Sequence, residues 1–186
     1  MKAFFLRLAL PLALPLALPL ALALLAGCST LDHSAAPAVD GKALWVVLPF
    51  ANNTETPLAG SRAEAIAESL LRAQGIGKLR RYPAALQQDA LFEPGDRKQL
   101  DAGLAWAREE GARYALTGSV DEWRYKVGVD GEPAVGVALS IVDVTSGETL
   151  WSGAGGKSGW SREALSAVAQ QLMRKLIGAG LAARQN

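Results

Sequence analysis

The sequence contains a single cysteine, Cys28, and a single histidine, His33. One cysteine allows no disulfide within a chain and no zinc site built from several thiolates. One histidine in a segment expected to lie outside the folded domain removes histidine-based acid–base catalysis and the Ser-His-Asp triad. We therefore expect no catalytic residue, no metal and no cofactor, and we do not expect an enzyme.

The chain also lacks an excess of charge of either sign, because 19 Lys and Arg balance 18 Asp and Glu. A nucleic-acid-binding domain carries a basic face, so this balance argues against nucleic acid as a partner. It equally argues against a polybasic patch that would bind anionic lipids.

What the sequence does have is a three-part N-terminus. Lys2 and Arg7 form a positive start, an uncharged apolar stretch follows over 8–25, and Ala-Gly then leads directly to Cys28. This layout predicts a signal peptide over residues 1–27, and the cysteine at the cut predicts a lipoprotein acylated on Cys28. Prolines repeated through the apolar stretch weigh against the alternative of a transmembrane helix.

The residues after the expected cleavage indicate where the mature chain resides. Ser29, rather than Asp, follows Cys28, which resembles the signal for transfer to the outer membrane, so we expect a lipid anchor on its periplasmic face. Residues 28–42 are small and polar, and they predict a flexible lipidated tether. Removing 27 of 186 residues leaves 159, enough for one domain over residues 43–186.

Hydrophobic periodicity predicts eight elements in residues 43–186. The Asp130-Gly131 pair predicts a hairpin turn. The order β-α-β-α-β-β-β-α predicts an α/β sandwich with a mixed sheet, in which the last three strands form an antiparallel meander. The expected strands are 44–50, 78–82, 112–129, 133–144 and 148–153, and the expected helices are 61–74, 96–110 and 161–179.

The glycine-rich segment GAGGKS at 153–158 resembles part of a phosphate-binding loop. The full motif requires a glycine six residues before the lysine, but Trp151 stands six residues before Lys157. The segment also follows a meander rather than a parallel strand. We therefore expect a mobile loop between the last strand and the last helix.

Three tryptophans in the C-terminal half have different expected roles. Trp123 alternates with charged residues and is expected in the core on the same face as Tyr125, and Trp151 is expected to be partly buried. Trp160 lies in a connection where nothing requires a large apolar side chain. It either packs onto the domain as a helix staple or contacts the membrane interface, which tryptophan favours.

Three segments together resemble the PelC family of outer-membrane lipoproteins. They are GSVDEWRYKVGVDGEPAVG at 118–136, TSGETLW at 145–151 and SGWSR at 158–162. The resemblance extends over about residues 44–180. It implies an α/β fold similar to the N-terminal domain of TolB. It also implies a dodecameric ring on the periplasmic side of the outer membrane, which guides a cationic exopolysaccharide of the Pel type to a PelB-like porin.

The resemblance also assigns roles to individual residues. Trp160 matches a position in an aromatic belt that contacts the membrane. Arg113 and Asp130 are candidates for positions on which function depends. A closed ring would gather the acidic side chains of every subunit around one lumen and so attract a cationic polymer. The candidates for this guiding or for assembly are Asp121, Glu122, Asp130 and Glu132.

Two other functions share the predicted architecture. A regulator of a periplasmic cell-wall synthase, similar to LpoB, needs a long tether, whereas the expected tether reaches at most about 50 Å when fully extended. A pore similar to CsgG needs membrane-spanning strands of about 9–11 residues, for which no spare pair of segments is visible. The sequence therefore favours the ring.

Overall fold

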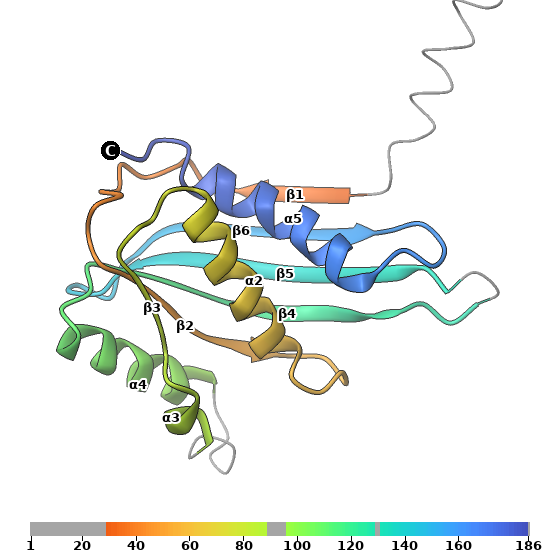
Figure 1. The fold of residues 1–186 in the computed structure, drawn as a ribbon, viewed down its shortest axis with the longest axis horizontal. Coiled ribbons are helices and arrows are strands. Elements are labelled where there is room, and N and C mark those ends of the chain that lie inside the picture. The colour runs from red at the N-terminus through yellow and green to blue at the C-terminus, as the bar shows by residue number, and fades with distance from the viewer. Residues whose placement is uncertain (1–28, 89–95, 129–130, 186) are drawn as a thin grey trace, which may run out of the picture.

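The computed structural model describes residues 29–88, 96–128 and 131–185 (Figure 1). The expected signal peptide, Cys28 and Asp130 lie outside these ranges. The described residues form one mixed sheet of six strands in the order β1-β6-β5-β4-β2-β3. Strand β2 is parallel to β3 and β4, while the other neighbours are antiparallel. The predicted α/β fold with a mixed sheet is thereby confirmed, and the likeness to TolB stays a prediction.

The elements follow the predicted order closely. The strands are β1 (Ser29–His33), β2 (Trp45–Asn52), β3 (Leu79–Arg81), β4 (Tyr114–Tyr125), β5 (Pro133–Asp143) and β6 (Thr149–Ser158). The helices are α2 (Ala59–Ala73), α3 (Ala84–Gln88), α4 (Asp96–Glu109) and α5 (Leu165–Gly180). Strand β1 and the short helix α3 were not anticipated, because neither has a hydrophobic period.

Helices α2 and α5 cover one face of the sheet and α4 covers part of the other (Figure 1). Alternate residues of β2 show this division, since successive side chains of a strand point to opposite faces. Trp45 and Val47 belong to the large core beneath α2 and α5. Val46 and Leu48 belong to a smaller core beneath α4.

The flexible tether expected over residues 28–42 is partly wrong. Residues 29–33 form the edge strand β1, which pairs with β6 in antiparallel register. Leu31 packs against the main core, and Val39 is fully buried. The segment is short and polar, so its order comes from pairing with an existing strand rather than from its own pattern.

The mobile loop expected at 153–158 is also wrong, because these residues complete β6 between β5 and β1. Glycine is required there by close approach rather than by flexibility. A Cβ atom on Gly155 would stand 2.8 Å from the carbonyl oxygen of Thr30 and 3.0 Å from Leu172 of α5. The glycines therefore let the edge strand and the helix pack closely onto β6.

Candidate functional site

One end of the sheet brings together the start of β1, the β4–β5 hairpin and the connection from β6 to α5. Ser29 lies opposite Lys157, and Ala134 lies opposite Ser158. Tyr125 and Pro133 close the β4–β5 pair at the same end. We call this end, defined by Ser29, Tyr125, Val127, Ser158 and Trp160, the distal end; it lies on the right in Figure 1.

Trp160 is 61% exposed at the distal end, directly after β6. Its backbone is nevertheless fixed, since its amide donates to the Glu163 carboxylate over 3.1 Å and its carbonyl accepts from the Glu163 amide over 3.0 Å. Gln171 of α5 donates to the other oxygen of the same carboxylate. The domain therefore holds an exposed indole on an ordered connection.

Sequence reasoning missed Glu163 as the residue that orders this connection. The available signal was its position three residues after Trp160, the same spacing at which a carboxylate reaches back to an amide in a capping box. Here the interaction lies in the connection that precedes α5, which begins at Leu165.

Two further exposed apolar side chains lie near Trp160 in the fold. Tyr125 is 50% exposed and Val127 is fully exposed, whereas Trp123 is buried. The expectation that Trp123 lies in the core is thus confirmed, but the same expectation for Tyr125 is wrong. Tyr125 lies beyond the cover of the core and uses its hydroxyl at the start of α5, where it accepts from the Leu165 amide and donates to the Glu163 carbonyl.

A cleft of about 670 Å³ lies between residues 53–57, which follow β2, and residues 121–124 of β4. Asp121 borders it and accepts a hydrogen bond from the Asn53 side chain over 2.8 Å. Glu55, a residue not singled out from the sequence, lines the same cleft. The Thr56 hydroxyl ties the cleft's two sides together by donating to the Trp123 carbonyl.

The remaining acidic candidates are closer to cations than the sequence suggested. Glu122 forms an ion pair of 3.0 Å with Arg124, and Glu132 lies 4.0 Å from Lys126. The fourth candidate, Asp130, lies outside the described residues. Asp121 and Glu122 both line the cleft. Glu132 does not line it and lies on the β4–β5 hairpin, directly before β5.

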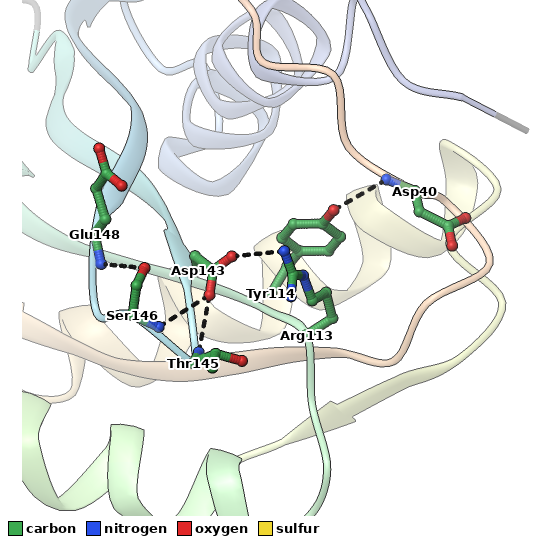
Figure 2. A network of polar contacts seen from close by, with 7 residues as sticks. All are labelled: Asp40, Arg113, Tyr114, Asp143, Thr145, Ser146 and Glu148. Atoms are coloured by element: carbon green, nitrogen blue, oxygen red, sulfur yellow. Dashed lines mark hydrogen bonds and ion pairs between the residues drawn. The ribbon is translucent and has the colours of Figure 1, made fainter.

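Arg113 does not join these acids, because it precedes β4 at the opposite end of the sheet. Its guanidinium pairs with the Asp143 carboxylate at 3.0 Å, and the same carboxylate accepts from the amides of Thr145 and Ser146 (Figure 2). The guanidinium also lies 5.7 Å from the centre of the Tyr114 ring. Arg113 therefore contributes to a structural network that holds the β5–β6 turn.

Asp143 is the centre of that network and is only 8% exposed. The Ser146 amide that donates to its carboxylate is the largest cause of a lowered Asp143 pKa, and the Thr145 amide and the Arg113 charge add to it. Burial opposes this shift by disfavouring the charged form. The net direction shows that the carboxylate is stabilised as an anion in the folded protein.

Within the part of the chain that the structure describes, no cluster of three or more His, Cys, Asp or Glu is arranged to hold a metal ion. Among the same residues, no helix combines the length and the apolar character needed to cross a bilayer.

Trp151, expected to be partly buried, is 1% exposed.

The chain is similar to solved structures of one protein family in particular. A PelC dodecamer from Paraburkholderia phytofirmans is 44% identical, with a TM-score of 0.70 over 85% of this chain and 100% of that one. A singly substituted form of the same dodecamer is 42% identical over 85% and 99% of the two chains, with a TM-score of 0.70. Lipoprotein GNA1162 from Neisseria meningitidis is 18% identical over 73% and 96%, and its TM-score of 0.51 shows a shared fold.

No family model and no curated protein sequence matches the chain. The six-stranded mixed sheet with helices on its faces defines the chain as an α/β domain. The identity and coverage given above are more specific: the chain belongs to the PelC family.

Proposed function

We propose that this protein is a lipid-anchored subunit of a homo-oligomeric ring on the periplasmic face of the outer membrane. The ring guides a cationic exopolysaccharide to an outer-membrane porin of the PelB type and has no enzymatic activity of its own. One observation carries this proposal. The chain is 44% identical to a PelC protein solved as a dodecamer, over 85% of this chain and 100% of that one.

The register of β1 supports an orientation for each subunit. Cys28, the expected site of acylation, is covalently adjacent to Ser29, and consecutive Cα atoms are about 3.8 Å apart. Ser29 lies at the distal end, where Trp160, Tyr125 and Val127 are exposed. The lipid and these apolar side chains then enter the same membrane surface, with Trp160 as the interfacial contact.

The acidic cleft supports the guiding role. Asp121, Glu122 and Glu55 line the cleft, and the Arg124 side chain pairs with Glu122. A closed ring repeats the cleft in every subunit, which creates many weak sites for a cationic polymer instead of one strong site. Weak repeated contacts let a polymer advance, whereas a single tight site would retain it.

Two measurements test this proposal. The mass of the acylated protein extracted in mild detergent reports whether a closed oligomer forms. Export of polymer from cells that carry Asp121→Lys, alone or with Glu122→Lys, reports guiding, with Glu109→Gln on α4 as the control. We expect a large oligomer and reduced export in the Lys variants; a monomer, or unchanged export with an intact ring, would contradict the respective half of the proposal.

The same register bears on the alternative of an LpoB-like regulator. Such a regulator must reach far from its own membrane, but here the sheet begins at Ser29, one residue after the expected lipid. The domain is therefore held even closer to the membrane than the predicted tether implied. This proximity favours a ring seated on the membrane.

A further inference from the structure

The charges of the chain balance as a whole, but not every cation at the distal end faces an acid. Two of these cations have acidic neighbours. Arg124 pairs with Glu122 at 3.0 Å, and Lys126 lies 4.0 Å from Glu132. Lys126 also donates to the Ser158 hydroxyl over 2.7 Å. The charges of Arg124 and Lys126 are therefore largely offset within the domain.

Lys157 and Arg162 have no such partner. Among the residues that the structure describes, neither side chain forms an ion pair or a hydrogen bond. Arg162 is exposed and Lys157 is partly buried. Glu163 follows Arg162 in sequence, but its carboxylate accepts from the Trp160 amide and the Gln171 side chain instead. We call Lys157 and Arg162 the distal cations.

Both distal cations lie close to the expected lipid. Lys157 stands opposite Ser29, the residue after Cys28, and paired residues of antiparallel strands have Cα atoms about 4.5–5.5 Å apart. Arg162 lies two residues after the exposed Trp160, in the connection from β6 to α5 (Figure 1). A membrane surface that receives the lipid and the indole is therefore within reach of both long side chains.

Arg162 also has a backbone conformation that arginine rarely adopts. Its φ is 63°, in the left-handed region. Since the Trp160 carbonyl accepts from the Glu163 amide, Arg162 is the third residue of a four-residue turn. A positive φ at this position favours glycine or asparagine, and such strained residues cluster at binding sites. An arginine that costs stability and contacts nothing in the described domain points to a ligand outside it.

We propose that Lys157 and Arg162 bind the phosphate groups of anionic phospholipids, so that the distal end prefers a negatively charged membrane surface. This inference rests on the proposed seating of the distal end on the membrane. The arginine guanidinium can donate two parallel hydrogen bonds to a phosphate. Each cation held near an anionic bilayer surface adds to the attraction.

The sign of the charge separates this ligand from the exported polymer. A cationic polymer is repelled by the distal cations, whereas Asp121 and Glu122 at the cleft attract it. The cations are thereby assigned to lipid and the acids to polymer. A ring repeats the two cations in every subunit, so a modest preference of one subunit becomes a large preference of the assembly.

Vesicle binding tests the preference. Residues 28–186 with Cys28→Ser, which cannot be acylated, are mixed with vesicles of phosphatidylcholine alone or of phosphatidylcholine with phosphatidylglycerol. Co-sedimentation measures the bound fraction. We expect tighter binding to the phosphatidylglycerol vesicles, and we expect salt at 1 M to remove the difference because the Debye length is then about 3 Å. Lys157→Gln should lower the preference about fivefold.

Arg162→Gly removes the charge and the backbone strain together. We expect the preference for phosphatidylglycerol to fall about fivefold. The melting temperature without lipid should rise by about 1–3 °C, because glycine adopts a positive φ without a steric penalty. Arg162→Lys keeps the charge and should keep most of the preference. Arg174→Gln, which removes an exposed cation from the middle of α5, is the matched control and should leave the preference unchanged.

The outcomes separate this inference from the proposed function. An unsubstituted chain that binds neither kind of vesicle would reject the seating of the distal end and the inference with it. Equal binding to both kinds would reject the inference alone. If Arg162→Gly lost binding to both kinds equally, Arg162 would act by holding Trp160 in place, and its assignment to phosphate would be overturned.

Discussion

Ser29 and Lys157 stand opposite each other in the antiparallel pair that β1 forms with β6. This pairing joins the residue after the expected lipid to the strand that leads into Trp160. Two features suggested membrane contact in the sequence, namely the expected acylation next to Ser29 and the tryptophan Trp160. Ser29 and Trp160 therefore lie at the same end of the sheet.

Gly155 controls the pairing of β1 with β6. We expect Gly155→Ala to destabilise the protein by about 1–3 kcal/mol, because overpacking a tight contact carries that cost, and its Cβ would stand 2.8 Å from the Thr30 carbonyl oxygen. Hydrogen exchange at the β1 amides measures the effect. Gly156→Ala is the matched control, since its Cβ meets no atom closer than 3.6 Å; equal protection of β1 in both variants would refute the role of Gly155.

Trp160 should add membrane affinity that is independent of the lipid. For a chain that begins at Ser29, we expect Trp160→Ala to lower partitioning onto lipid vesicles about tenfold, equivalent to about 1.4 kcal/mol and within the range for burying a large apolar side chain. Co-sedimentation with vesicles measures this partitioning. Leu86→Ala, which removes an exposed leucine of α3, should leave it unchanged. A packed role for Trp160 would instead appear as a loss of thermal stability.

Glu163 should matter for membrane contact although it does not itself need to touch the membrane. Glu163→Ala removes the acceptor of the Trp160 amide and of the Gln171 side chain. We expect weaker vesicle partitioning than in the unsubstituted protein and a stability loss of about 1–3 kcal/mol, because two hydrogen bonds are lost and each typically contributes about 0.5–1.5 kcal/mol. Faster exchange of the Trp160 amide is the specific readout, and an unchanged rate would contradict the assignment.

Asp143 should make the turn between β5 and β6 sensitive to acid. Its folded pKa is lowered by the Ser146 and Thr145 amides and by Arg113, so it stabilises the fold above its unfolded pKa of about 3.9. That stabilisation is lost as the pH falls through the lower, folded-state pKa.

Replacing the Asp143 carboxylate tests this linkage. We expect Asp143→Asn to unfold with about 1–3 kcal/mol less free energy at neutral pH, because the Thr145 and Ser146 amides and the Arg113 guanidinium lose a charged acceptor. The difference from the unsubstituted protein should shrink below about pH 4 in denaturant titrations. Arg113→Met should cost less, about 0–1 kcal/mol, since its guanidinium is half exposed. A constant difference at all pH values would exclude Asp143 as the titrating group.

The strands and helices with a clear hydrophobic period were predictable, because their own residues specify which side is buried. Trp45–Asn52 and Leu165–Gly180 are examples, and both lie within a few residues of the expected ranges. Strand β1 and the second half of β6 were not predictable in this way. Their residues are mostly polar or glycine, without a hydrophobic period, and they become strands because neighbouring strands and α5 pack against them.

The candidate site was predictable in part for a related reason. Residue types indicated the exposed Trp160 and the acidic stretch at 121–132, but spacing in sequence concealed which of them meet. Arg113 and Asp121 are eight residues apart on one extended strand, about 26 Å at the rise of a β-strand. A straight strand cannot fold back, so Arg113 serves the turn beside Asp143 and cannot join the acids of the cleft.

The short edge strand also determines how the domain bears a mechanical load. A pull on the lipid expected at Cys28 acts along β1, whose five residues pair with β6. Pulling along the strand axis strains all these pairs together in shear, whereas a pull across the sheet would open them one after another. A moving polymer that drags the domain along the strand axis would therefore load the β1–β6 hydrogen bonds in shear. This is the direction in which these bonds resist separation most strongly.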